Sequence, residues 1–315
     1  MVRVMMKPSK LKKGDIVGVI APASPPKTEP LQKAIRFLEE LGLNVKVGKS
    51  VHKKYGYLAG EDKERIEDIH EMFKDRNVKA IFCACGGFGT GRIVSRLDFE
   101  LIRQNPKIFW GYSDITFLHT AIHQQTGLVT FHGPMLSSDI GLDDVHEATK
   151  ESFQQLFHSG DIEYTYDKSK LETVVEGVAG GQVIGGNLTL LVSTLGTPYE
   201  VDTKGKLLFI EDIDEEPYKV DRMVNQLKMA NKFNEASGII IGDFKNCVPK
   251  KRERSLTLDE VLTAHIASAG KPVIKGFKIG HSSPSIAIPV GSLGIMDTFE
   301  HTLKIESGIS EVENR

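Results

Sequence analysis

The sequence of 315 residues contains little cysteine, with only Cys83, Cys85 and Cys247. Three unevenly spaced cysteines cannot build a disulfide framework, which excludes the small disulfide-rich secreted class and favours a reducing compartment. A run of about 18 apolar residues is also missing, so no membrane-spanning helix is predicted. The first 15 residues include lysines but no apolar stretch followed by a small-residue cleavage site. We therefore expect no secretory signal and a cytoplasmic location.

An excess of charge of either sign is absent as well. The chain has 40 Lys and Arg against 42 Asp and Glu, a formal net charge of -2, so neither nucleic acid nor a membrane surface is expected as a partner. The rest of the composition is that of an ordinary globular protein, 40% hydrophobic and 26% charged. The length is sufficient for two domains.

The first half alternates short apolar runs with amphipathic helical patterns, which predicts an α/β fold whose parallel sheet is covered by helices on both faces. The predicted strands are 16–21, 43–47, 78–84, 107–110 and 128–131, and the predicted helices are 31–41, 64–73 and 116–125.

A change of character follows at residues 159–183, which are polar, lack a long periodicity and end in Gly180-Gly181. We interpret this stretch as the crossing between domains. The predicted organisation is a first domain over 1–160, a linker over 161–180 and a second α/β domain over 181–315. The expected strands of the second domain are 182–184, 207–210, 238–242, 273–279, 285–289 and 301–306, with helices at 187–195, 218–230 and 258–269.

The feature with the clearest chemical meaning is the run Lys107-Ile108-Phe109-Trp110-Gly111-Tyr112-Ser113-Asp114-Ile115-Thr116. An apolar strand stops at Gly111, Ser113 follows two residues later, and a helical pattern begins at once. This arrangement mounts a nucleophile on a sharp strand-to-helix turn. The free N–H groups at the start of the next helix face the point where an oxyanion would form. The run therefore predicts a serine hydrolase.

A serine nucleophile requires a base, and the sequence offers two main candidates. His281 follows Gly280 at the end of the predicted strand 273–279, where catalytic side chains of α/β proteins lie. His132, in Phe131-His132-Gly133-Pro134, also ends a strand and is the rival. His119 and His123 share one helical face at a spacing that suits a metal, but the third ligand and the glutamate of a zinc peptidase are missing nearby.

The base in turn requires a carboxylate to orient it. Glu211 stands where the apolar run 207–210 ends, so it is expected to be partly buried and to need a partner. An acidic loop is the alternative, because Asp212, Asp214, Glu215 and Glu216 follow. These acids lack the glycine and the regular spacing of a calcium loop.

A second oxyanion donor is expected from the glycine-rich run Cys85-Gly86-Gly87-Phe88-Gly89-Thr90-Gly91, which follows a buried strand. Glycines let the backbone approach a ligand and expose N–H groups. The run could also cradle a phosphate, but it departs from the dinucleotide pattern and lacks the Lys-Ser/Thr of a P-loop. Beside Ser113 it is better interpreted as an oxyanion loop, in which the N–H of Gly87 pairs with that of Asp114.

Several motifs in fixed order resemble the LD-carboxypeptidases of serine peptidase family S66, which include the muramoyltetrapeptide carboxypeptidases. The resemblance covers nearly the whole chain. It rests on Tyr57-Leu58-Ala59-Gly60, Gly86-Gly87-Phe88-Gly89, Gly111-Tyr112-Ser113-Asp114-Ile115-Thr116, Phe131-His132-Gly133-Pro134-Met135, Gly185-Gly186-Asn187-Leu188, Glu211-Asp212, Tyr218, Asp221-Arg222 and Gly280-His281.

The resemblance implies a flavodoxin-like nucleophile domain, a smaller swivelling C-terminal α/β domain and a Ser-Glu-His triad that spans both. Position by position, it places the nucleophile on Ser113, the orienting acid on Glu211 and the base on His281, with Gly87 and Asp114 as backbone oxyanion donors. It further implies cleavage of an L-residue–D-alanine bond in a small murein peptide, wall-peptide recycling and a homodimer. Neither a cofactor nor a metal is expected.

The sequence departs from the family's common Arg-Gly-Gly-Tyr-Gly, having Cys85-Gly86-Gly87-Phe88-Gly89 instead. This change bears on how the substrate is held. For the substrate's terminal carboxylate, Arg92 and Arg222 are the candidate partners. Three other functions stay open: a microcin C self-immunity peptidase of the same family, which cleaves an aminoacyl-nucleotide amide; an α/β-hydrolase esterase, which would want glycine where Ile115 stands; and a nucleotide-binding module.

Overall fold

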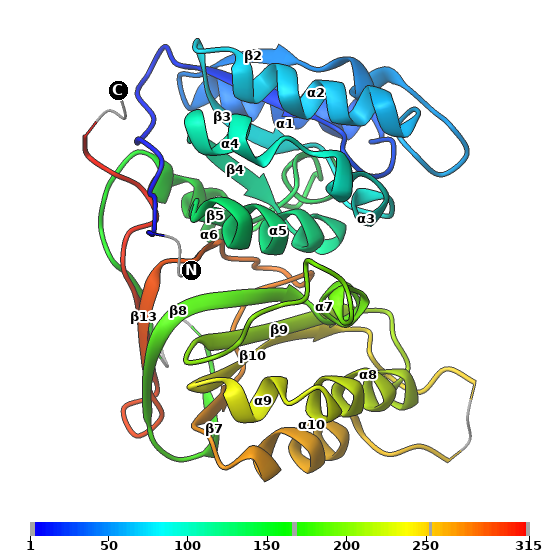
Figure 1. Cartoon of the computed structure of the whole chain (residues 1–315), viewed down its shortest axis with the longest axis vertical. Coiled ribbons are helices and arrows are strands. Elements are labelled where there is room, and N and C mark those ends of the chain that lie inside the picture. Colours follow the sequence, from blue (N-terminus) through cyan, green and yellow to red (C-terminus); the bar gives the residue numbers. More distant parts are fainter. Residues whose placement is uncertain (1–3, 166–168, 252–253, 313–315) are drawn as a thin grey trace. The chain divides into compact units, whose positions relative to one another are not determined.

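The computed structural model describes residues 4–165, 169–251 and 254–312 and divides the chain into two compact α/β units. The first unit comprises residues 1–160, 286–291 and 307–315, and the second comprises 161–285 and 292–306. Each unit contains one sheet with its own helices (Figure 1). Every helix in the described residues is too short or too polar to span a bilayer.

The sheet of the first unit has the strand order β12-β5-β4-β3-β1-β2. Its five early strands are mutually parallel in the order 2-1-3-4-5, which is the order of flavodoxin-like folds and confirms the predicted fold class. Strands are β1 (Ile16–Ile20), β2 (Asn44–Val47), β3 (Val78–Cys83), β4 (Ile108–Gly111), β5 (Thr130–His132) and β12 (Ile288–Val290); helices are α1 (Thr28–Glu40), α2 (Asp62–Lys74), α3 (Thr90–Ile93), α4 (Phe99–Gln104), α5 (Thr116–Thr126) and α6 (Glu147–Glu151).

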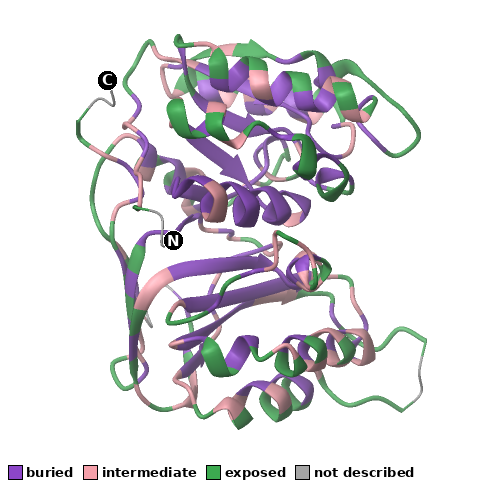
Figure 2. Ribbon diagram, viewed as in Figure 1, coloured by how far each residue is buried: buried purple, intermediate pink, exposed green. Residues whose placement is uncertain are grey.

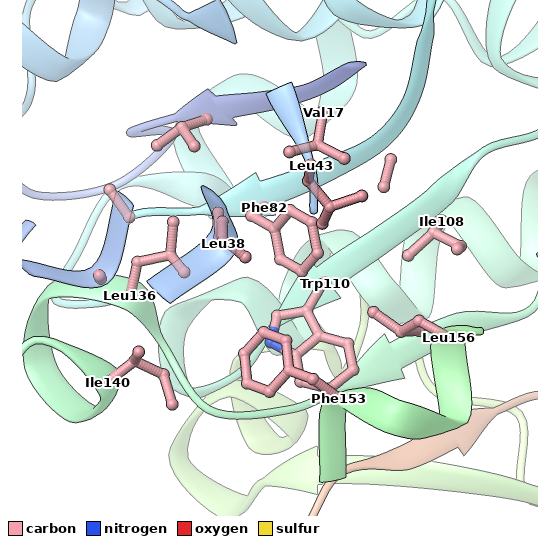
Figure 3. Packing of buried hydrophobic residues seen from close by; sticks show 14 of the residues in the cluster. Val17, Leu38, Leu43, Phe82, Ile108, Trp110, Leu136, Ile140, Phe153 and Leu156 are labelled. Carbon is pink, nitrogen blue, oxygen red and sulfur yellow. The ribbon is translucent and has the colours of Figure 1, made fainter. Parts of the chain in front are cut away.

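Alternate side chains of these strands supply two cores, because successive strand residues point to opposite faces. On one face, Phe82 and Trp110 pack with residues of α1, and Phe153 lies against the Trp110 ring at 4.4 Å between centroids (Figure 3). On the other face, Phe109 stacks on Phe73 of α2. Burial on both faces explains why these strands are continuous apolar runs in the sequence.

One strand of the first unit comes from late in the chain. Strand β12 pairs antiparallel with β5, so that Ile288 lies opposite His132. Gln155 donates a hydrogen bond to the Ala287 carbonyl at 3.1 Å, and Ile309 joins the same core. The predicted boundaries thus differ from the observed units, because residues 286–291 and 307–315 belong with the first unit rather than with the second.

The second unit has a mixed sheet in the order β6-β14-β13-β8-β9-β10-β11-β7, in which β8 to β11 are parallel. Helices α7, α8 and α10 pack on the parallel part through a second apolar core. Strands are β6 (Ile162–Tyr164), β7 (Glu172–Val175), β8 (Val178–Asn187), β9 (Leu207–Ile213), β10 (Gly238–Lys245), β11 (Val273–Lys275), β13 (Leu293–Asp297) and β14 (Thr302–Ile305); helices are α7 (Leu188–Thr194), α8 (Pro217–Met229), α9 (Lys232–Glu235) and α10 (Leu258–Ile266).

The segment 161–180, for which a linker was expected, contains β6, β7 and the start of β8, and residues 166–168 lie outside the described part. Strands β6 and β7 form the two edges of the sheet and are short and partly exposed. Edge strands bury little surface, so they need no apolar run. Figure 2 shows the contrast with the buried central strands of the same sheet.

The strand predicted over 273–279 is shorter than expected. It ends at Lys275, because Gly276 adopts φ +100 and a Cβ there would lie 2.4 Å from the Lys170 carbonyl oxygen. Strand β9 is longer than expected and continues to Ile213. Glu211 therefore lies within a central strand and not in an acidic loop.

Candidate active site

Ser113 lies on the turn between β4 and α5, in a 3-10 turn over Ser113–Ile115. Its φ of +59 places a non-glycine residue in the left-handed region, which costs energy and is typical of a nucleophile on a sharp turn. Residues 107–123 are all buried except Ser113, which is partly exposed. The predicted strand–turn–helix is therefore present, and the serine is its accessible residue.

The glycine-rich loop lies directly against this turn. A Cβ on Gly86 would stand 2.9 Å from the Ser113 Cβ and 3.0 Å from its Oγ. Gly87 has φ +104, and a Cβ there would lie 2.2 Å from the Ser24 Oγ, so only glycine fits. Ser24 also accepts a hydrogen bond from the Phe88 N–H at 3.2 Å and donates its own N–H to the Gly86 carbonyl at 3.1 Å. The loop is thus held by the segment that follows β1.

Asp114 connects the turn to the end of the loop. Its Oδ2 accepts the Thr90 N–H at 2.9 Å, and its main-chain carbonyl accepts the Thr90 hydroxyl at 2.6 Å. Burial raises the pKa of the Asp114 carboxyl to about 6, although the bonds from Thr90 and the charge of Arg65 oppose this shift. The Asp114 N–H belongs to the first turn of a helix, where backbone donors lack intrahelical acceptors.

Arg65 of α2 is a fully buried charge beneath the same loop. Its guanidinium donates to the Gly89 carbonyl at 2.9 Å and to the Pro22 carbonyl, and it forms an ion pair with Asp62 at 2.6 Å. Burial lowers the pKa of Arg65, and Asp62 opposes that effect. Three separate segments therefore meet at one cation.

In the second unit, Glu211 and His281 form a hydrogen-bonded pair. The His281 Nδ1 lies 2.7 Å from the Glu211 Oε2 although 70 residues separate them. The Glu211 side chain is 0% exposed and that of His281 is 12% exposed. Burial raises the pKa of Glu211, whereas the charge and hydrogen bond of His281 lower it. A carboxylate on Nδ1 orients the ring so that Nε2 is the nitrogen that exchanges protons.

Glycines and amides surround this pair. A Cβ on Gly280, which has φ +123, would lie 2.7 Å from the Glu211 Oε2, so glycine leaves room for the carboxylate. Asn187 pairs in register with Glu211 across β8 and β9. The neighbouring Asp212 points to other partners, accepting bonds from Asn187 Nδ2 at 2.9 Å and from Thr189. The adjacent acids of the Glu211-Asp212 motif therefore have different tasks.

The three other histidines that the sequence singled out lie in the first unit, each with contacts of its own. His119 is buried, its Nε2 lies 2.7 Å from the Gly111 carbonyl oxygen, and burial lowers its pKa to about 4. His123 Nδ1 lies 3.1 Å from the Leu128 carbonyl oxygen. His132 is buried with its ring edge-to-face against Tyr112. Over the ranges that the structure describes, no three His, Cys, Asp or Glu side chains gather as metal ligands.

The two candidate carboxylate binders lie in different units. Arg92 of α3 is 45% exposed and holds Asp62 with two bonds, at 3.0 and 3.1 Å. Arg222 of α8 lies over the Tyr218 ring, with 5.9 Å between its guanidinium carbon and the ring centroid. Substrate binding by either arginine stays a prediction.

Sequence reasoning overlooked Ser24 and Arg65 and gave no separate role to Thr90, although all three hold the glycine-rich loop. Only Arg65 could have been recognised from the sequence pattern. It lies beside Ile66 and four residues before Ile69, on the buried side of α2, where a charged side chain requires partners. Ser24 and Thr90 are small polar residues of a kind common in loops, so their spacing carries no comparable signal.

A serine on a strained turn above a parallel sheet, together with a buried carboxylate–histidine pair, provides the residue types that define α/β serine hydrolases. The family models give the particular class. Residues 17–133 match the LD-carboxypeptidase N-terminal domain, and residues 180–294 match the LD-carboxypeptidase C-terminal domain. The chain belongs to the LD-carboxypeptidase family, a family of serine peptidases.

Named relatives agree with this assignment. The chain is 65% identical over 305 residues to the Bacillus subtilis (strain 168) protein named "Probable murein peptide carboxypeptidase", covering 97% of this chain and 96% of that one. It is 30% identical to the Escherichia coli microcin C7 self-immunity protein MccF, covering 88% and 89%. The crystal structure of muramoyltetrapeptide carboxypeptidase from Oxalobacter formigenes has a TM-score of 0.84 at 28% identity, covering 94% and 100%.

Proposed function

We propose that this enzyme is a serine carboxypeptidase that removes D-alanine from murein tetrapeptides, with Ser113 as nucleophile, His281 as base and Glu211 as the acid that orients it. The observation that carries the proposal is the buried bond of 2.7 Å between His281 Nδ1 and Glu211. The 65% identity to a protein named for murein peptide cleavage supports the choice of substrate.

In the proposed reaction, His281 accepts the Ser113 hydroxyl proton as the oxygen attacks the carbonyl of an L-residue. Glu211 stabilises the imidazolium that forms, and burial strengthens this charge interaction. The N–H groups of Gly87 and Asp114 bind the oxyanion, each contributing about 3–4 kcal/mol of transition-state stabilisation. His281 then protonates the departing D-alanine, and water hydrolyses the acyl-enzyme.

The setting of the reaction follows from the family resemblance. The enzyme acts in the cytoplasm as a homodimer and trims wall peptides that return to the cell, without cofactor or metal. Arg92 or Arg222 meets the carboxylate of the substrate. The two arginines differ in their contacts. The guanidinium of Arg222 lies over an aromatic ring, whereas that of Arg92 already forms an ion pair with Asp62, to which a substrate carboxylate would be added.

The test is D-alanine release from L-Ala-γ-D-Glu-diaminopimelate-D-Ala by the wild type and by Ser113→Ala. We expect release by the wild type and a loss of at least about 10³-fold in the variant, because the nucleophile is gone while the oxyanion donors remain. Circular dichroism and thermal unfolding provide the folding control. A Ser113→Ala enzyme that keeps full activity contradicts the scheme.

A second candidate is supported by the likeness to MccF, a self-immunity protein for microcin C7. The same triad would then cleave the amide between an aminoacyl group and a nucleotide-like moiety. Parallel assays with the tetrapeptide and with an aminoacyl-sulfamoyl adenosine separate the two functions. Faster turnover of the sulfamoyl compound, expressed as kcat/KM, would replace the carboxypeptidase proposal.

A further inference from the structure

Thr90 holds Asp114 at two points. Its N–H binds the Asp114 carboxylate at 2.9 Å, and its hydroxyl binds the main-chain carbonyl of the same residue at 2.6 Å. Thr90 is fully buried, so water cannot replace either bond. Asp114 directly follows Ser113, which means that Thr90 holds the residue whose N–H is the proposed oxyanion donor on the nucleophile turn.

The other proposed donor lies only three residues before Thr90. Between them, Gly89 has φ +131, and its carbonyl is bound by the buried Arg65 at 2.9 Å. Arg65 also binds the Pro22 carbonyl and Asp62, so the lower side of the loop is attached to α2 and to the segment after β1. Short, buried, charge-assisted bonds of this kind leave the backbone little freedom.

We infer that Thr90 and Arg65 are positioning residues that set the distance between the Gly87 and Asp114 N–H groups. An oxyanion hole stabilises the transition state only if its donors are already in place, since reorganising them during the reaction would consume the stabilisation. Thr90 attaches the loop to the nucleophile turn, and Arg65 attaches it to the body of the first unit. The inference rests on the proposed function of Ser113, Gly87 and Asp114.

A matched pair of variants tests the role of Thr90. Thr90→Val keeps the shape and the N–H but removes the hydroxyl that binds the Asp114 carbonyl, whereas Thr90→Ser keeps the hydroxyl. The first readout is the second-order rate constant for phosphonylation of Ser113 by a fluorophosphonate, which needs the oxyanion hole but no murein substrate. The second is the division of any change between kcat and KM for D-alanine release.

We expect Thr90→Val to slow phosphonylation and to lower kcat by about 10-fold with KM unchanged, less than the roughly 10²–10³-fold caused by loss of a whole donor. Thr90→Ser should stay within about 2-fold of the wild type, because the hydrogen bond is retained. Equal rates for folded Thr90→Val and Thr90→Ser would overturn the inference. A change confined to thermal stability would also overturn it, because it would make Thr90 structural only.

Arg65→Lys examines the other attachment if Thr90→Val fails to fold. Lysine keeps the positive charge, but its single nitrogen cannot occupy both the Nη1 position that binds the two carbonyls and the Nη2 position that binds Asp62, so the same fall in the phosphonylation rate is expected. An unchanged rate would overturn the inference. A wild type that is phosphonylated on Ser113 but releases no D-alanine would refute the proposed substrate alone. A Ser113 that does not react in the wild type would refute the positioning role as well.

Discussion

Asp114 is a carboxylate held where little water reaches it. Burial is the main reason that its pKa rises from 3.8 to about 6. In the unfolded chain this carboxyl loses its proton near pH 4, so between about pH 4 and pH 6 the folded state binds more protons than the unfolded state. Stability must therefore fall as the pH rises through this window. The bonds from Thr90 reduce this cost without removing it.

The variant Asp114→Asn removes this titration. The shift in pKa corresponds to about 3 kcal/mol, so we expect the wild type to lose up to that amount of unfolding free energy between pH 4 and pH 6 relative to Asp114→Asn. The asparagine Oδ1 can still accept the Thr90 N–H. Urea unfolding of both proteins at half-unit pH steps measures the difference. Parallel pH profiles for the two proteins would contradict the assignment.

Glu211 and Asp212 are adjacent in β9, and the Asn187 side chain lies near both, since it lowers the pKa of each carboxyl by hydrogen bonding. Their other partners differ, because Glu211 binds His281 whereas Asp212 accepts hydrogen bonds from Thr189. Burial raises the pKa of both carboxyls. A pair of acids that looks like one feature in the sequence thus has two roles: Glu211 is the proposed orienting acid, and Asp212 anchors the start of α7.

At the scale of elements, Asp212 fastens the start of α7. Its carboxylate accepts the N–H and hydroxyl of Thr189, the amide of Asn187 and the N–H of Ile213. Asp212→Ala would leave the buried Asn187 amide without this acceptor and would also remove the acceptor of the Thr189 and Ile213 donors. We expect a loss of about 2–4 kcal/mol in unfolding free energy. Chemical denaturation measures this quantity directly.

The matched control in the same unit is Asp259→Ala on α10. Asp259 is exposed, and its ion pair with Lys275 lies at the surface, so its loss should cost less than about 1 kcal/mol. Similar losses in both variants would mean that Asp212 is no more important to the fold than a surface charge, which would contradict the role assigned to it.

At the scale of the whole molecule, the chain passes between the units four times, after residues 160, 285, 291 and 306. The first unit is therefore completed only when residues near the end of the chain have been made. Strand β12 covers the edge of β5, and Ile309 enters the core beside Trp110 and Phe153. The stability of the first sheet therefore depends on a strand that lies more than 150 positions after β5 in the sequence.

Substitution of Ile288 tests this dependence in the intact chain. Ile288 is buried in β12, so Ile288→Ala should cost about 2–5 kcal/mol. Hydrogen exchange should accelerate first in β5 of the first unit and not in β10 of the second. Leu293→Ala is the control, because Leu293 lies nearby in sequence but is exposed. Faster exchange in β10 alone would contradict the assignment of β12 to the first unit.

Much of the fold was predictable because its signals are local. The central strands are apolar on both faces, so each appears as a short run bounded by turn residues, and the alternation with helices indicated a parallel sheet. The edge strands β6 and β7 left no such signal, since an edge buries little surface. The shortening of β11 at Gly276 depends on contact with Lys170, which lies 106 positions away and cannot be anticipated from the strand itself.

By itself, the sequence determined the class of fold, the strand-to-helix turn that carries Ser113, and the motifs of the family. Each of these depends on residues within one strand, turn or helix, where periodicity and glycine placement decide the backbone. The pairing of Glu211 with His281 was expected from the family resemblance, whereas the residues alone left His132 as a rival, and the hydrogen bond between them is seen only in the tertiary structure. That Arg65 and Thr90 hold the glycine-rich loop, and that β12 completes the first sheet, came from the tertiary structure alone. These contacts join distant segments, and strand order, which no local pattern encodes, determines which segments meet.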